Sequence, residues 1–255
     1  MTLDKIGKYE FLIEPFHCDF SQRLFVGHLG NHLLNAADFH SNDRGFGMNY
    51  LSTIHKTWVL SRLAIELESL PKAYSRMSVE TWVDGVMRFF THRNFKMTDA
   101  ETGAVYGYGR SVWAMIDTET RQPADILAVK EGSIVNYVDD ATPCPIDASS
   151  RVKIGGEADL VGSVETHYSD VDINGHINSV KYLEHLFDLM TESWHQVYRV
   201  QRVDVAYVAE SHFRDVLHYY KEEVAPDEEL YRIVKCTPVG ETAEVCRVAV
   251  KWVAK

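Results

Sequence analysis

The chain has 255 residues, of which 45% are hydrophobic and 25% are charged, a composition typical of a soluble globular protein. The formal net charge of −11 argues against nucleic acid as a partner, because phosphate binding relies on a basic surface. No run of about 18 consecutive apolar residues is present, so we expect no membrane span.

The N-terminal sequence MTLDKIGKYE lacks the apolar core of an export signal, so we expect a cytoplasmic protein. The four cysteines, Cys18, Cys144, Cys236 and Cys246, are far apart and show no metal-ligand spacing, as expected of thiols in a reducing compartment. The twelve histidines include no HExxH pair. We therefore expect no metal and no cofactor.

The first half begins with an extended entry, FLIEPFHCDF, and continues into a predicted helix, VGHLGNHLLNAADFH. One face of this helix is apolar, with Val26, Leu29, Leu33 and Ala36 at helical spacing. The turn-rich SNDRGFG is expected to end the helix. Four strand-like runs rich in aromatic and β-branched residues follow, at 57–68, 76–85, 87–99 and 104–117.

The stretch from about 118 to 160 contains Pro123, Pro143 and Pro145. Because proline interrupts both helices and central strands, this stretch is interpreted as a connector with short helical turns.

The second half repeats the order of elements. An extended stretch at 162–170 precedes a predicted helix from about Asn178 to Trp194, and four more strand-like runs follow, at 198–210, 215–223, 229–239 and 241–255. Val180, Leu183, Phe187, Met190 and Trp194 form the apolar stripe of this helix.

A long helix followed by an antiparallel meander predicts an α+β arrangement in which a sheet wraps one central helix, which is the hot-dog fold. Because the order occurs twice, we predict a double hot-dog of two tandem units. The expected boundaries are 1–125 for the N-terminal hot-dog, 126–160 for a linker and 161–255 for the C-terminal hot-dog.

The stretch HYSDVDINGHINSVKYLEHLFDLM places Asp172, Asn174 and His176 directly before the second helix. The Asn174–Gly175 pair favours a turn, and Asn178 or Ser179 is the expected N-cap. Free N–H groups at this helix start, aided by the helix dipole, can bind a developing oxyanion. Taken alone, the same residues fit a polar capping turn equally well.

The segment SDVDINGHINSVKYLEHLFD is similar to the signature of the acyl-[acyl-carrier-protein] thioesterases of plants and bacteria, Asp-x-Asn-x-His-x-Asn followed by Lys-Tyr. NDRGFG, SVETWVDG, GRSVWAMIDTETRQP and AYVAES resemble other parts of that family, so the resemblance extends over roughly residues 8–250. The family has a double hot-dog fold, in agreement with the element order. Because we find no plastid transit peptide, the chain resembles a bacterial member.

The resemblance implies hydrolysis of a fatty acyl thioester by a water that a general base activates. It places Glu210 opposite the motif, and we expect Glu210 to be the base, with His176 orienting the water or sharing that role. Asn174 would hold the water or the carbonyl, and Asp172 would fix Asn174 and His176. Plant members have a cysteine where this chain has Ser211, which argues against a cysteine nucleophile here.

The N-terminal half is expected to bind the acyl chain in a tunnel. Ordinary core packing is the favoured interpretation for any single candidate wall residue, and the candidates are Met48, Trp58, Trp82, Phe89 and Trp113.

The family's partner, the acyl carrier protein, is acidic, so its docking needs a local basic patch on this acidic chain. Arg151, Lys153 and Lys181 are the candidates nearest to the motif in sequence. A monomer or a homodimer is expected.

The nearest alternative function is a hot-dog thioesterase that acts on acyl-CoA, although no Gly-rich phosphate loop stands out. A hot-dog dehydratase or hydratase also pairs a carboxylate with a histidine, but Asn174 and Glu210 fit hydrolysis better. A non-catalytic carrier-binding module is a third alternative. The first half has only HCDFSQRLFVGH before its helix, so we expect one active site per chain.

Overall fold

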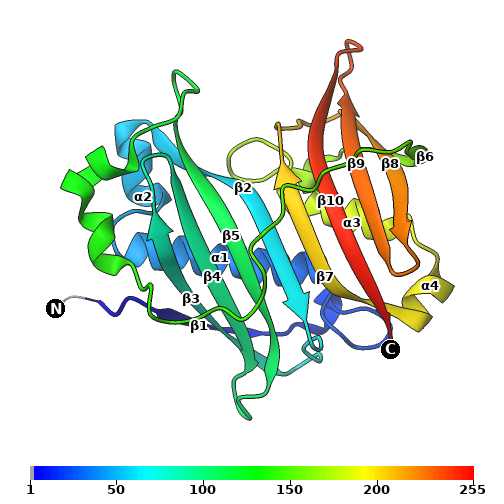
Figure 1. The fold of residues 1–255 in the computed structure, drawn as a ribbon, viewed down its shortest axis with the longest axis horizontal. Coiled ribbons are helices and arrows are strands. Elements are labelled where there is room, and N and C mark those ends of the chain that lie inside the picture. Colours follow the sequence, from blue (N-terminus) through cyan, green and yellow to red (C-terminus); the bar gives the residue numbers. More distant parts are fainter. Residues whose placement is uncertain (1–2) are drawn as a thin grey trace. The chain divides into compact units, whose positions relative to one another are not determined.

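The computed structural model describes residues 3–255, which divide into two compact units, one up to Ser149 and one formed by Ser150–Lys255 (Figure 1). Each unit consists of an antiparallel sheet with a helix against one face, so each has the hot-dog arrangement that the sequence predicts. No helix among residues 3–255 is both long and apolar enough to cross a membrane.

The sheet of the first unit has the strand order β1-β3-β4-β5-β2, with all neighbours antiparallel. Its elements are β1 (Gly7–Leu12), α1 (Val26–Asp43), α2 (Met48–Leu51), β2 (Lys56–Leu67), β3 (Arg76–Val86), β4 (Phe90–Asp99) and β5 (Val105–Asp117), with short 3-10 segments at Pro15–His17, Ser52–Ile54 and Ile126–Tyr137.

Helix α1 packs across the sheet through the apolar face predicted from the sequence, since Val26, Leu29, Leu33 and Ala36 are all buried. The approach to β5 is close at Gly109, where an added Cβ would lie 3.2 Å from Phe95 and 3.5 Å from Leu33. The absence of a side chain at this strand position therefore lets the helix sit near the sheet.

The segment after β5 contributes to the core of the first unit. Ile126, Val129 and Ile134 are buried in one cluster with Phe46 and Met115. The chain then follows the other face of the sheet, where the N–H of Asp139 donates to Val83 and the guanidinium of Arg110 donates to the carbonyl of Ile146. The short helical turns expected here are present. The functional division at 125/126 and 160/161 stays a prediction.

The sheet of the second unit has the strand order β7-β10-β9-β8-β6, again antiparallel throughout. Its elements are β6 (Asp159–Glu165), a 3-10 segment (Tyr168–Asp170), α3 (Lys181–Asp188), α4 (Glu192–Val197), β7 (Tyr198–Tyr207), β8 (Val216–Ala225), β9 (Glu228–Cys236) and β10 (Thr242–Ala254).

The single helix predicted from Asn178 to Trp194 is wrong in its bounds, because the structure contains two short helices, α3 and α4. Residues before α3 form a turn in which the side chain of Asn178 accepts from the N–H of Val180, an alternative to helical pairing. The predicted helix is interrupted between α3 and α4. The hydroxyl of Thr191 caps α4 by accepting from the N–H of Trp194 at 3.2 Å.

Candidate active site

The motif before α3 forms a tight hairpin, residues 171–177, whose two ends pair as an antiparallel bridge. Across it, the N–H of Asp172 donates to the carbonyl of His176 at 2.8 Å. Gly175 makes the turn with a φ of 80°, a conformation that glycine adopts without strain. The turn expected at Asn174–Gly175 is thus confirmed.

The side chain of Asp172 organises the tip of this hairpin. Its carboxylate accepts from the backbone N–H of Asn174 at 2.8 Å and from the amide of Asn174 at 3.4 Å. The Asn174 side chain is exposed, so its amide can meet a ligand. Asp172 pairs with His176 through the backbone.

A second segment, residues 208–215, lies beside the hairpin. The N–H of Ile177 donates to the carbonyl of Ser211 at 2.9 Å, and this contact brings the preceding residue, Glu210, towards the motif. Nε2 of His176 lies 3.2 Å from Oε2 of Glu210, and both side chains are partly exposed, 26% and 31%. A histidine and a carboxylate 34 positions apart therefore form a pair that solvent can reach. Their expected roles stay predictions.

Two residues that sequence reasoning missed also contact this pair. The ring of His212 stands at 80° to the ring of His176, with centroids 5.1 Å apart. The ammonium of Lys235, on β9, donates to the backbone carbonyl of Glu210 at 2.7 Å. Neither residue belongs to a recognisable spacing. The pairing of β9 in the sheet brings Lys235 to Glu210, and the contact of Ile177 with Ser211 brings the next residue, His212, to the hairpin.

The N–H groups at the start of α3 are largely used by the protein itself. Those of Ile177, Asn178 and Lys181 donate to the carbonyls of Ser211, Asp170 and Asn178. This is unfavourable for the oxyanion site expected at the helix start. The exposed amide of Asn174 is the better-placed donor.

The four cysteines are all free thiols. Burial raises the pKa of Cys144 and Cys246, and also that of Cys18. A raised pKa makes a thiol a poorer nucleophile at neutral pH, and no cysteine lies in the hairpin or in 208–215. Among residues 3–255, no group of three or more His, Cys, Asp or Glu side chains could hold a metal ion.

The five candidate wall residues of the first unit do not share one surface. Trp58 and Trp113 lie on the face of the sheet that also carries the buried Met115. Strand alternation places Trp82, which is 2% exposed, on the opposite face. Met48 lies in α2 and Phe89 in the β3–β4 turn. The tunnel stays a prediction, for which Trp58 and Trp113 are the better-placed residues.

The three candidate docking residues differ in their surroundings. Arg151 and Lys153 are exposed. The ammonium of Lys181 lies 2.6 Å from Glu184 and 3.9 Å from Asp170, and its side chain is only 25% exposed. Lys181 is therefore engaged in ion pairs within the unit.

The two hot-dog units place the chain in the class of double hot-dog proteins, and the histidine–carboxylate pair lies in the unit that contains α3. Sequence comparison then identifies the family. The model of the acyl-ACP thioesterase N-terminal domain matches residues 5–130, and that of the C-terminal domain matches residues 156–253. The chain therefore belongs to the acyl-ACP thioesterase family, whose members are thioester hydrolases.

Individual relatives agree with this assignment. The chain is 48% identical to an acyl-ACP thioesterase from Bacteroides thetaiotaomicron of known structure, with a TM-score of 0.88 and 98% of each chain covered. It has the fold of the 12:0-ACP thioesterase from Umbellularia californica, with a TM-score of 0.85, 19% identity and 100% of both chains covered. It is 23% identical to oleoyl-acyl carrier protein thioesterase 2 of Arabidopsis thaliana over 87% of this chain. The chain spans 64% of the length of that curated relative.

Proposed function

We propose that the protein hydrolyses the thioester of a fatty acyl-[acyl-carrier-protein] and so releases a free fatty acid and terminates chain elongation. The observation that carries the proposal is the 3.2 Å contact between His176 and Glu210 beside the exposed Asn174. Family membership supplies the substrate class, since the relatives named above are thioesterases of acyl carrier protein.

In the proposed reaction Glu210 is the general base. Its carboxylate accepts a proton from a water while the water oxygen bonds to the thioester carbon, and the carbonyl electrons move to the oxygen. The amide of Asn174 stabilises that oxyanion. Collapse of the tetrahedral species breaks the C–S bond, and the thiolate leaves without strong acid catalysis because it is a good leaving group. The proton held by Glu210 then passes to the thiolate or to solvent, which restores the carboxylate. General-base catalysis and stabilisation of the oxyanion should each accelerate the reaction on the order of 10²-fold or more.

His176 holds the water against Glu210 or shares the base role with it. The T-shaped contact with His212 restricts the His176 ring on a second side, and Lys235 holds the backbone of Glu210. No cofactor takes part in this scheme, which uses only water and these side chains.

The acyl chain is proposed to bind in the first unit, near Trp58 and Trp113, and the acidic carrier protein to dock through Arg151 and Lys153. Chain-length preference would follow from the depth of that site, at about 0.8 kcal/mol for each methylene. A cytoplasmic location and a homodimer stay predictions.

The test is thiol release from carrier-bound thioesters of increasing chain length, with matched CoA thioesters alongside. We expect preferential cleavage of the carrier-bound forms and a loss of about 10³-fold in kcat for Glu210→Gln. Glu165→Gln, an exposed glutamate on β6, is the matched control and should retain wild-type activity.

Cleavage of CoA thioesters alone would replace this proposal with an acyl-CoA thioesterase. Full activity in Glu210→Gln would exclude Glu210 as the base. Loss of thioesterase activity in Glu210→Gln, together with full activity in His176→Ala, would restrict the base role to Glu210.

A further inference from the structure

Asp170 is a buried carboxylate that the proposed reaction does not use. Its side chain is only 5% exposed. Burying an ionised carboxylate is unfavourable unless it is paired and hydrogen-bonded. The contacts that compensate Asp170 therefore indicate what it does.

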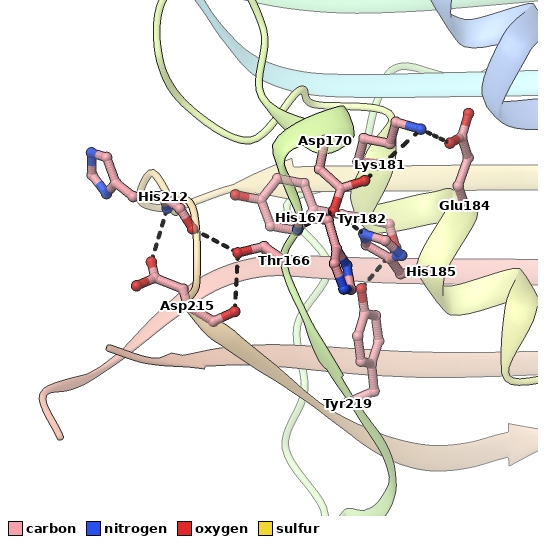
Figure 2. A network of polar contacts seen from close by, with 10 residues as sticks. All are labelled: Thr166, His167, Asp170, Lys181, Tyr182, Glu184, His185, His212, Asp215 and Tyr219. Atoms are coloured by element: carbon pink, nitrogen blue, oxygen red, sulfur yellow. Dashed lines mark hydrogen bonds and ion pairs between the residues drawn. The ribbon is translucent and has the colours of Figure 1, made fainter. Parts of the chain in front are cut away.

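The side-chain contacts of Asp170 join the segment around His167 to helix α3 (Figure 2). Oδ2 accepts from the backbone N–H of His167 at 2.7 Å and lies 3.2 Å from Nε2 of His185. Oδ1 lies 3.9 Å from the ammonium of Lys181. Lys181 and His185 are four residues apart, so they occupy one face of α3.

The backbone of Asp170 closes the base of the hairpin. Its carbonyl accepts from the N–H of Asn178 at 2.8 Å, directly outside the bridge between Val171 and Ile177. One residue thus connects the hairpin that carries Asp172, Asn174 and His176 to the first turns of α3.

At the equivalent place in the first unit stands His17, whose ring nitrogen lies 3.3 Å from a carboxylate oxygen of Glu14 in an exposed pair, not a buried carboxylate. The backbone carbonyl of His17 accepts from the N–H of Phe25 at 3.0 Å. The His17 ring stacks on His28 with centroids 4.1 Å apart. The buried carboxylate is therefore found in the unit that carries the His176–Glu210 pair.

We infer that Asp170 is a positioning residue, which fixes the hairpin of 171–177 on α3 and thereby sets the place of His176 relative to Glu210. The inference rests on the proposed function for its catalytic consequence. A displacement of about 1 Å at a reacting group can cost about 10²-fold in rate.

The experiment compares Asp170→Asn with Asp159→Asn, which makes the same chemical change at an exposed carboxylate of the same unit. One readout is kcat and KM on a carrier-bound thioester. The other is hydrogen–deuterium exchange of the intact protein, which needs no activity. For Asp170→Asn we expect kcat to fall about 10²-fold with KM within about threefold, and faster exchange confined to 167–178. Asp159→Asn should match the wild type.

A wild-type kcat or unchanged exchange at 167–178 in Asp170→Asn would overturn the inference. Faster exchange throughout the second unit, β8 and β9 included, would overturn it too, because Asp170 would then serve general stability. A wild-type protein without thioesterase activity would refute the proposed function, while local exchange would still test the anchor.

His185→Gln is a second variant if Asp170→Asn does not fold. It removes one partner of the carboxylate, and we expect a loss of about tenfold in kcat with the same local pattern of exchange. Combined with Asp170→Asn, its effect should be less than multiplicative, as it is for residues in one network. Multiplicative effects would contradict a shared anchor.

Discussion

The hairpins at 18–24 and 171–177 have the same backbone in the two units. In each, the first and last residues form an antiparallel bridge. The second residue, Asp19 or Asp172, donates its N–H across the hairpin at 2.8 Å and accepts at its carboxylate from the N–H two residues later, also at 2.8 Å. Two stretches with little sequence identity thus build one turn around one aspartate.

The side chains on this common backbone differ in chemistry. Where the second unit has His176, the first has Arg23, and where the second has Glu210, the first has Leu70. The guanidinium of Arg23 donates to the backbone carbonyl of Leu70 at 2.6 Å. The first hairpin therefore has a permanently charged donor bound to a backbone carbonyl at the place where the second has the histidine and the carboxylate of the proposed reaction. The shared turn sets the position of these side chains, and the proposed reaction depends on which side chains it carries.

The largest expected effect comes from giving the second hairpin the side chains of the first. His176→Arg combined with Glu210→Leu should lower kcat by about 10³-fold, because it removes both the base and its histidine. Thioester hydrolysis by the purified variant measures this loss. Arg23→His, the matched change in the first hairpin, should stay within twofold of wild type. Substantial activity in the double variant would show that the reaction takes place elsewhere.

The two cores also differ in the charge that they bury. On β4, Arg93 donates to the hydroxyls of Thr81 and Ser41 at 3.1 and 3.0 Å. On β9, Glu229 lies 2.6 Å from the ammonium of Lys221 and also accepts from Tyr231 and Trp252. The hydrogen bonds of Arg93 go to neutral hydroxyls, with Asp38 as a more distant carboxylate, whereas Glu229 is in direct contact with an ammonium.

Glu229→Gln should therefore lower the free energy of unfolding by about 3 kcal/mol at pH 7, since it removes the buried carboxylate that pairs with Lys221 and leaves only an exposed one. Urea unfolding followed by circular dichroism measures this. Glu223→Gln is the control, because Glu223 contacts the same Lys221 at 3.0 Å but is 76% exposed, and should cost at most about 0.5 kcal/mol. Equal losses of unfolding free energy in Glu229→Gln and Glu223→Gln would show that burial of the carboxylate does not determine its contribution.

The effect of Glu229 should depend on pH. Burial raises the pKa of Glu229, but the hydrogen bonds from Lys221, Tyr231 and Trp252 outweigh it and hold the pKa below its ordinary value. The stabilisation is thus present above the unfolded-state pKa of about 4.3 and is lost as the pH falls through the lower folded-state pKa. The difference between wild type and Glu229→Gln should narrow in that range, and a constant difference would contradict this account.

The smallest expected effect concerns the turn itself. Gly175 has a φ of 80°, whereas the equivalent residue of the first hairpin is Gln22 with a φ of 61°. An added Cβ at Gly175 would meet nothing within 4 Å, so Gly175→Ala should cost only the backbone term, about 1 kcal/mol. Urea unfolding against Gly155→Ala, which has equal space and no left-handed φ, isolates this term. A much larger loss would mean that the hairpin is under additional constraint.

The parts of the fold that the sequence predicts correctly depend on local chemistry. The apolar face of α1 follows from helical spacing, and the turn at Asn174–Gly175 follows from the preference of glycine for left-handed φ. The prediction of a single helix over 178–194 is wrong because an unbroken apolar stripe carries no sign of the break between α3 and α4 or of the cap at Thr191.

The remaining features depend on partners distant along the chain. Asp170 is buried only because α3 brings Lys181 and His185 to it. The contact of Lys235 with Glu210 requires the pairing of β9 in the sheet. Trp82 lies away from Trp113 because strand register, not composition, sets its face. The resemblance to a family placed His176 and Glu210 near each other, which no local pattern could do.

The shared hairpin also indicates which substitutions each unit can accept. Its hydrogen bonds are retained in a unit that has Arg23 and Leu70 in place of His176 and Glu210, so the turn itself does not require the proposed catalytic pair. Under the proposed function, a new side chain at 18–24 has only to be compatible with folding, whereas one at 171–177 has to be compatible with folding and with turnover. The first hairpin should therefore accept a wider range of side chains than the second.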